Sequence, residues 1–255
     1  YPKGLYVKSP EDMTELFQDV PEAVENTNRI ADRCETTIDF SKSHAPVVRV
    51  TAPRKAPKWD GKTDLTTWFK EWCNKIELHP FDESRDKNTD RSKLEDECDR
   101  ALRVLAETGL IWRYGTDGIT EEVQARCDRE LRILSEKKIS AYFLICWDFV
   151  NWARQRGIPA SARGSGVGTM VGYVLGLSNA CPVTFGLLFE RFTDPDRDEY
   201  PDIDIDICQN GRGQVIQYVR EKYGHVAQII TFGRLKARAA IKDVSRVMGL
   251  EPVEG

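Results

Sequence analysis

Aspartate and isoleucine alternate three times in the run PDIDIDI, residues 201–207. On a β-strand, residues i and i+2 point to the same side, roughly 6.6–6.8 Å apart, so Asp202, Asp204 and Asp206 would share one face. Like charges at that spacing repel unless a cation lies between them. Oxygen ligands suit Mg²⁺ and Mn²⁺, and carboxylates bridging two ions about 3.5–4 Å apart are typical of two-metal phosphoryl transfer. The run therefore predicts a site for two Mg²⁺ ions, for which Mn²⁺ can substitute.

Two other interpretations of this run are weaker. An EF-hand loop also places Asp at alternate positions, but counting from Asp202 its sixth residue is Ile207 instead of Gly. The twelfth residue is Gly213 instead of Glu, so the calcium-loop pattern fails. An exposed acidic edge strand is the remaining alternative. The isoleucine at every intervening position and the leading proline make it less favourable.

A glycine-rich motif, RGSGVGT at residues 163–169, precedes the acidic run. Glycines let backbone N–H groups approach phosphate oxygens, and the helix expected after the motif would offer its positive N-terminus. The motif is neither a Walker A loop nor a clean dinucleotide fingerprint. Alone it fits a tight turn between helices equally well. Combined with a downstream carboxylate strand, it indicates a phosphate cradle beside a metal pair, the two halves of a nucleotidyl-transfer site.

Composition excludes several other classes of protein. The chain has 255 residues, of which 31% are charged, and a net charge of −4. No apolar run is long enough to span a bilayer, so we expect no membrane segment. Seven cysteines without a CxxC pair and three dispersed histidines argue against a disulfide framework or a zinc site. The chain starts with neither Met nor an apolar signal region, and we expect it to be a piece of a longer protein.

Apolar spacing and capping residues predict the elements that would position these motifs. The first half favours helices, with a helix expected over 65–76. The second half mixes both types, so the expected fold class is α/β or α+β with many helices. Expected helices there are 149–156, 170–175, 213–223 and 235–248. Expected strands are 142–146, 203–207 and 226–232.

Six motifs, in this order and spacing, resemble the bacterial replicative DNA polymerase III alpha subunit family (family C). They are YFLI (142–145), RGS (163–165), LFERF (188–192), PDIDID (201–206), QIITFG (228–233) and KDVSRV (242–247). The resemblance implies a nucleotidyltransferase-like palm of the DNA polymerase beta type over 91–255, running toward the thumb. Residues 1–35 resemble the end of the family's N-terminal polymerase-and-histidinol-phosphatase domain. Residues 36–90 match poorly and would be a helical linker or an insertion.

The resemblance also implies roles for individual residues. Asp202 and Asp204 match the catalytic aspartates that bind Mg²⁺, and Asp206 matches a further acidic residue of the metal site. The positions that correspond to nucleotide-binding residues are Arg163, Gly164, Ser165 and Arg191. Arg238 and Lys242 match basic positions expected to face DNA phosphates. The family's Pro-Gly before Arg-Gly-Ser is replaced here by Ser161-Ala162.

The implied activity is DNA-directed DNA polymerisation in replication. A primer 3′-hydroxyl would attack the α-phosphorus of a deoxynucleoside triphosphate and release pyrophosphate, with primer–template DNA bound. The longer protein would contact the sliding clamp and other replisome subunits in the cytoplasm. The family's third catalytic aspartate would lie beyond residue 255, so we expect this segment alone to be inactive. Two alternatives remain open: a non-templated nucleotidyltransferase, and a DNA-binding fragment without activity of its own.

Overall fold

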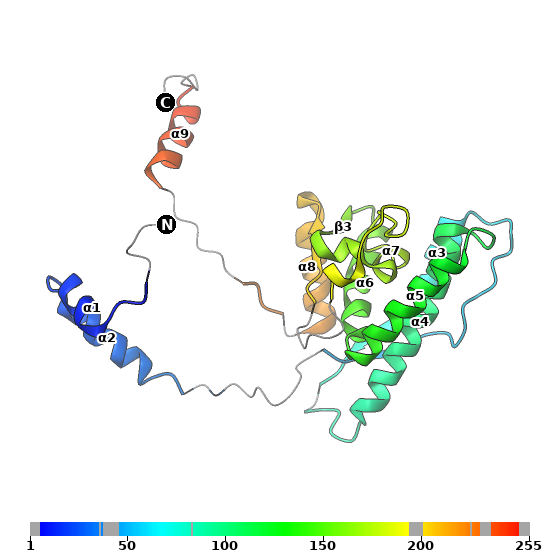
Figure 1. Cartoon of the computed structure of the whole chain (residues 1–255), viewed down its shortest axis with the longest axis horizontal. Helices are drawn as coiled ribbons and strands as arrows, with labels where there is room; N and C mark the ends of the chain where they lie inside the picture. The colour runs from blue at the N-terminus through cyan, green and yellow to red at the C-terminus, as the bar shows by residue number, and fades with distance from the viewer. Residues whose placement is uncertain are drawn as a thin grey trace. The chain divides into compact units, whose positions relative to one another are not determined.

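A computed structural model describes residues 6–35, 37, 46–82, 84–193, 201–224, 226–229 and 236–249 of the chain (Figure 1). The chain divides into two compact units, Tyr1–His44 and Ala45–Gly255. None of the helices described combines the length and the apolar character that a membrane crossing requires.

The first unit contains two short helices, α1 (Pro10–Leu16) and α2 (Pro21–Ala31). Ser9 begins α1 with a capping box, in which its hydroxyl accepts the Asp12 N–H and the Asp12 carboxylate accepts the Ser9 N–H. A proline is the first residue of each helix, a position where the missing backbone N–H would have no partner within the helix. Neither helix has a buried residue, so local capping, rather than a hydrophobic core, defines this unit among the residues described.

The second unit mixes helices with two small antiparallel sheets, which confirms the α+β class. Its helices are α3 (Leu65–Cys73), α4 (Arg91–Tyr114), α5 (Glu121–Glu136), α6 (Ser140–Gln155), α7 (Met170–Val174), α8 (Gln209–Tyr223) and α9 (Ala237–Val247), with 3₁₀ turns η1 (Gly164–Gly168) and η2 (Phe189–Arg191). Its strands are β1 (Val48–Thr51), β2 (Glu77–Pro80), β3 (Ala160–Arg163) and β4 (Asp204–Ile207). In the part described, β1 pairs with β2 and β3 with β4.

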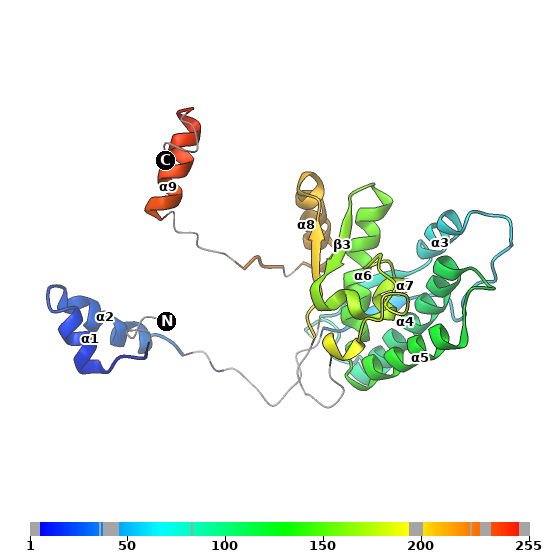
Figure 2. The same ribbon diagram turned by 45° about the horizontal axis from the view of Figure 1, so that its top comes forward.

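Helices α4 and α6 form the centre of the hydrophobic core, with α5 and α7 packed beside α4 (Figures 1 and 2). The Asp90 carboxylate accepts the Ser92 N–H and starts α4. Gly115, with φ of 68°, ends it. Phe143 and Trp147 of α6 are among the largest fully buried side chains. Strand β3 of the second sheet packs against α6 of this core, and β4 pairs with β3.

The strand expected over 142–146 is wrong, because these residues lie inside α6. Phe143 and Leu144 are 0% exposed, and Ala141, just before the expected strand, is also buried. A helix that is buried on most sides loses the polar face from which a period of 3.6 residues is recognised. Its short apolar run then cannot be distinguished from a buried strand by pattern alone.

Residues 46–82, part of the range 36–90 expected to be a linker or an insertion, fold within the second unit. Strands β1 and β2 pair in the register Val48↔Pro80 to Thr51↔Glu77. The Phe69 ring of α3 stacks on Trp112 of α4, with ring centroids 4.3 Å apart. The division between compact units therefore falls between His44 and Ala45, and no separate unit begins at residue 91.

The second sheet carries the motifs of interest and packs with α8 against α6 (Figure 2). β3 and β4 are antiparallel, with Arg163 opposite Asp204 and Ala160 opposite Ile207. The expected strand at 203–207 is thus confirmed as β4, and the helices at 213–223 and 235–248 as α8 and α9. Residues 226–229 form no strand, and the rest of the strand expected there lies outside the described residues.

Candidate functional site

The acidic strand β4 keeps its alternation in the folded chain. Ile203 is only 8% exposed, and Ile205 and Ile207 pack against buried clusters. The side chains of Asp204 and Asp206 are 46% and 72% exposed. The isoleucines thus anchor the strand to the core while these carboxylates point away from it, as the alternation predicts.

Arg163 of β3 bridges these two carboxylates. Its terminal nitrogen lies 3.2 Å from Asp204 Oδ2, and its Nε lies 3.1 Å from Asp206 Oδ1. A single cation therefore reaches both side chains, which confirms that they share one face. Because all three side chains are well exposed, each ion pair contributes little to stability, about 0.2–1 kcal/mol. Arg163, predicted to bind nucleotide, contacts the acidic strand in this structure.

Asp202 precedes β4 and has an exposed side chain. Within the described residues no hydrogen bond or ion pair joins its carboxylate to those of Asp204 and Asp206. It lies near α6, since its charge adds to burial in raising the pKa of the Cys146 thiol to about 12. The next residue, Ile203, donates its backbone N–H to the Tyr142 hydroxyl at 2.9 Å.

The glycine-rich motif folds into the 3₁₀ turn η1 directly beside the acidic strand. Gly164 has φ of +61°, a conformation that glycine adopts without strain. A Cβ atom at Gly164 would lie 3.6 Å from Asp204 Oδ2, and one at Gly166 would lie 3.3 Å from the Ile203 side chain. The turn and the carboxylates, which are about 40 residues apart in sequence, are therefore in contact through the β3–β4 pair.

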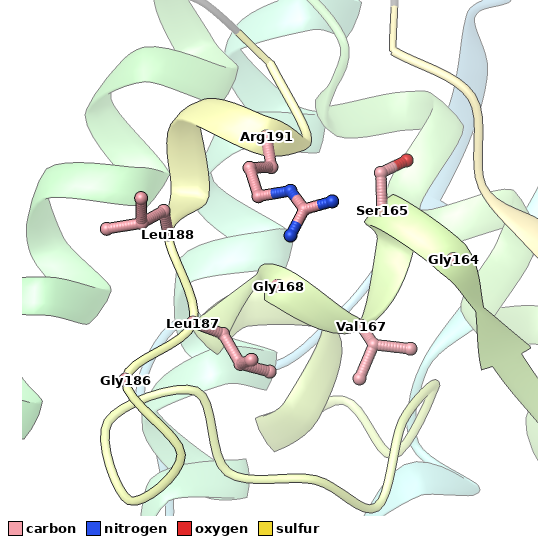
Figure 3. Close-up of a pocket in the computed structure, with 8 residues that line it drawn as sticks. All are labelled: Gly164, Ser165, Val167, Gly168, Gly186, Leu187, Leu188 and Arg191. Carbon is pink, nitrogen blue, oxygen red and sulfur yellow. The ribbon is translucent and has the colours of Figure 1, made fainter.

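A pocket of about 610 Å³ opens between η1 and the segment that leads into η2 (Figure 3). Its lining residues are Gly164, Ser165, Val167, Gly168, Gly186, Leu187, Leu188 and Arg191. The Arg191 guanidinium points toward the turn that carries Ser165, and both side chains are exposed. Gly164, Ser165 and Arg191, three of the predicted nucleotide-binding residues, thus line one pocket.

Helix α5 holds both walls of this pocket through the buried pair Arg126–Glu130. Arg126 Nε donates to Glu130 Oε1 at 2.6 Å. A terminal nitrogen of the same guanidinium donates to the carbonyl oxygens of Gly168 and Leu187, each at 3.1 Å. One carbonyl belongs to η1 and the other to the opposite wall, so Arg126 ties the two walls together.

The Glu130 side chain also caps the first turn of α7. Its Oε2 accepts the Val171 N–H at 3.0 Å, while the Thr169 hydroxyl accepts the Gly172 N–H at 2.6 Å. Burial raises the pKa of Glu130, and the N–H groups and Arg126 oppose that shift. The expectation that this helix N-terminus binds a phosphate is therefore wrong, because the protein's own side chains take those N–H groups. A phosphate in the pocket would be left to Arg191, Ser165 and the turn.

Arg126, Glu130 and Tyr142 were not among the predicted site residues. A signal for Glu130 was present, because it falls on the helical face that carries Val123, Cys127 and Leu134. A carboxylate on an apolar face must find partners or lose its charge. Arg126 four residues earlier is the expected partner on the same helix.

Arg238 and Lys242 lie on α9, where both side chains are exposed. In the part of the chain described, no interaction joins either of them to the acidic strand or to η1. Their predicted contact with DNA phosphates stays a prediction.

The donor set at the acidic strand fits a hard divalent cation in its chemistry. Its side chains offer carboxylate oxygens on one face, and a cationic group already bridges two of them. Nowhere in the described ranges do three His, Cys, Asp or Glu side chains form a metal-binding group. The expected binding of Mg²⁺ by these carboxylates stays a prediction.

Comparison with known proteins gives the family. The family model of the bacterial DNA polymerase III alpha NTPase domain matches residues 100–254, more than half of the chain. The chain belongs to this family. The matched part of the chain includes the acidic strand, η1 and the Arg126–Glu130 pair, and it begins after β1, α3 and β2.

Individual relatives align with nearly all of the chain. The DNA polymerase III subunit alpha of Chlamydia muridarum is 38% identical over 257 residues, covering 97% of this chain and 19% of the relative. Those of Neisseria meningitidis serogroup B and Campylobacter jejuni are also 38% identical, covering 97% and 95% of this chain. The chain spans about a fifth of the length of these relatives.

Proposed function

We propose that the second unit is part of the polymerising centre of a DNA-directed DNA polymerase, with the palm architecture implied by its family. The observation that carries this proposal is the contact between the acidic strand and the glycine turn. Asp204 Oδ2 lies 3.6 Å from the position of a Gly164 Cβ, and Ser165 and Arg191 line the adjoining pocket. Carboxylates for metal ions and groups for a triphosphate are thus neighbours, as nucleotidyl transfer requires.

In this proposal Asp202 and Asp204 hold two Mg²⁺ ions, with Asp206 as an additional acidic neighbour. When bound, these ions would favour deprotonation of the primer 3′-hydroxyl and stabilise charge on the phosphate oxygens. The aspartates themselves transfer no proton. An ion at Asp204 competes with Arg163 for the same oxygen, Oδ2, since Arg163 lies 3.2 Å from it.

The pocket would bind the triphosphate of a deoxynucleoside triphosphate. The Arg191 guanidinium offers a fixed set of donors that matches phosphate geometry, and the Ser165 hydroxyl offers one more. Holding the triphosphate against the carboxylate strand converts a bimolecular reaction into an oriented one. Primer–template DNA would be the second substrate, with Arg238 and Lys242 available for its phosphates.

Primer extension tests the proposal, using the longest native protein that contains this sequence, a defined template and Mg²⁺. Asp204→Asn should abolish templated extension while preserving DNA binding, because it removes a ligand charge and leaves the fold intact. Asp128→Asn is a matched control, since its side chain is 48% exposed and pairs with Arg103 at 2.9 Å. This closely resembles Asp204, which is 46% exposed and pairs with Arg163.

The outcomes separate the candidate functions. Extension that follows the template in wild type and Asp128→Asn, but not in Asp204→Asn, supports the polymerase. Products whose sequence ignores the template would indicate a non-templated nucleotidyltransferase. Near-normal extension by Asp204→Asn would refute the role of the acidic strand.

A further inference from the structure

Tyr142 of α6 contacts the peptide that lies between the two candidate metal ligands. The Ile203 N–H donates to the Tyr142 hydroxyl oxygen at 2.9 Å, across 61 residues of sequence. Ile203 separates Asp202 from Asp204, so this hydrogen bond is made at the backbone that orients both carboxylates.

The β3–β4 ladder does not extend to this peptide. Its first pair is Arg163↔Asp204, and Asp202 and Ile203 precede it. Asp204 is therefore held by strand pairing, whereas Asp202 is not. Among the described residues, the Tyr142 hydroxyl is the group that accepts the Ile203 N–H, in place of a strand partner.

The surroundings of Ile203 keep this contact rigid. Its side chain is 8% exposed and packs within 3.3 Å of the position of a Gly166 Cβ. Burial raises the pKa of Tyr142. The ring also packs edge to face against Phe143, with centroids 6.3 Å apart.

We infer that Tyr142 is a positioning residue that sets the spacing of the Asp202 and Asp204 carboxylates for divalent-ion binding. This inference rests on the proposed function, because it assumes that these carboxylates hold Mg²⁺. Side chains on either side of a peptide point where its backbone dihedral angles direct them. Fixing the Ile203 N–H thus fixes the direction of Asp202 relative to Asp204, and Tyr142 acts on the ions through the strand without touching them.

Tyr142→Phe tests this role because it removes the accepting oxygen and keeps the ring. The expected result is a roughly three- to tenfold weaker affinity for divalent ions, the effect of losing one supporting hydrogen bond. Tyr223→Phe is the matched control. It removes another partly buried hydroxyl of the same unit, which donates to Asp148 at 2.9 Å and, among the described residues, makes no hydrogen bond to the acidic strand.

The readout is site-specific cleavage of the backbone by Fe²⁺ with ascorbate and peroxide, in the longest native protein that contains the sequence. Fe²⁺ at the carboxylates should cut the chain near residues 202–204, and Mg²⁺ should suppress the cut by competition. The Fe²⁺ concentration for half-maximal cutting and the Mg²⁺ concentration for half-suppression then report affinity at this site without any turnover. Melting temperature and DNA affinity of each variant report whether the fold persists.

The reference variant Asp204→Asn distinguishes failure of the Tyr142 role from failure of the proposed metal site. The inference is supported if Asp204→Asn abolishes the cut, Tyr142→Phe shifts both concentrations upward, and Tyr223→Phe matches wild type. It is overturned, with the proposed function intact, if Tyr142→Phe behaves like Tyr223→Phe while Asp204→Asn abolishes the cut. If Asp204→Asn cuts normally, the proposed metal site fails and the inference fails with it.

Discussion

The buried carboxylate of Glu130 caps helix α7 by accepting the backbone N–H of Val171 at 3.0 Å, across 41 residues of sequence. The same carboxylate pairs with Arg126, which reaches the carbonyl oxygens of both pocket walls. Glu130 is 0% exposed and the Arg126 side chain 19% exposed, and neither residue lines the pocket. The geometry of the pocket therefore depends on residues outside its lining.

Glu130→Ala should open the pocket region locally. It would leave the mostly buried Arg126 cation without its carboxylate and the Val171 N–H without its acceptor. Breaking one partner of a buried pair typically costs about 3–5 kcal/mol. We expect the free energy of local opening around residues 168–177, measured by hydrogen exchange in the longest native protein, to fall by this amount.

The neighbouring pair Arg129–Glu190 is the control, because both side chains are substantially exposed. Glu190→Ala should lower the same free energy by less than about 1 kcal/mol. Equal effects of the two substitutions would contradict the structural role given to Glu130.

Two helical glycines should respond to alanine with opposite signs. Gly109 of α4 lies against α7, where a Cβ would come within 2.1 Å of the Val174 carbonyl oxygen. Gly213 of α8 has no atom within 4 Å of that position. Gly109→Ala should therefore destabilise by about 2–3 kcal/mol through overpacking. Gly213→Ala should stabilise by about 0.5–1 kcal/mol, the ordinary helix preference for alanine. Hydrogen exchange along α4 and α8 measures both, and stabilisation by Gly109→Ala would show that α4 and α7 are farther apart.

Arg163→Gln should strengthen divalent-ion binding at the acidic strand. Arg163 and an ion compete for Asp204 Oδ2, and removing an exposed ion pair of about 0.2–1 kcal/mol corresponds to roughly a 1.5- to fivefold gain in affinity. Half-suppression of the Fe²⁺-dependent cut should then need less Mg²⁺. Weaker suppression in Arg163→Gln would mean that the guanidinium assists the ions instead of competing with them.

The cysteines should separate sharply by reactivity. Cys34 and Cys208 are exposed, whereas Cys73, Cys98 and Cys146 are buried. Burial raises the pKa of the Cys73 and Cys146 thiols to about 12 and that of Cys98 to about 11. Because the thiolate is the reactive form, Cys73, Cys98 and Cys146 should resist alkylation between pH 7 and 9, whereas the exposed Cys34 and Cys208 are accessible to the reagent. Peptide mapping by mass spectrometry checks this, and rapid labelling of Cys73 in the folded protein would contradict the described core.

The acidic strand and its partners show what a sequence pattern can predict. A period of two is explicit in PDIDIDI, and the exposure of Asp204 and the burial of Ile203 follow from it. The proximity of Gly164 to Asp204 was expected from the chemistry that the two motifs suggest together. The register that achieves it, Arg163 opposite Asp204, is a long-range pairing that neither motif encodes locally.

The remaining elements depended on tertiary contacts. Residues 142–146 were misassigned because α6 is buried on most of its sides. Residues 36–90 were expected to be a linker or an insertion, in part because residues 52–63 are rich in proline and lysine. Their ordering comes from distant packing such as that of Phe69 on Trp112. Tyr142 begins the YFLI motif, but the motif does not indicate its role, which depends on a backbone group 61 residues away.

The antiparallel pairing of β3 with β4 also constrains how the sequence can drift in evolution. The segment joining the two strands carries η1, α7 and Arg191, so the contact between η1 and Asp204 depends on the ladder that brings the two ends of this segment together. A one-residue insertion inside β4 would exchange the isoleucine and aspartate faces beyond it. Insertions or deletions in β4 would therefore have to come in pairs of residues to keep each side chain on its face. Substitutions would have to keep aspartate and isoleucine at alternate positions.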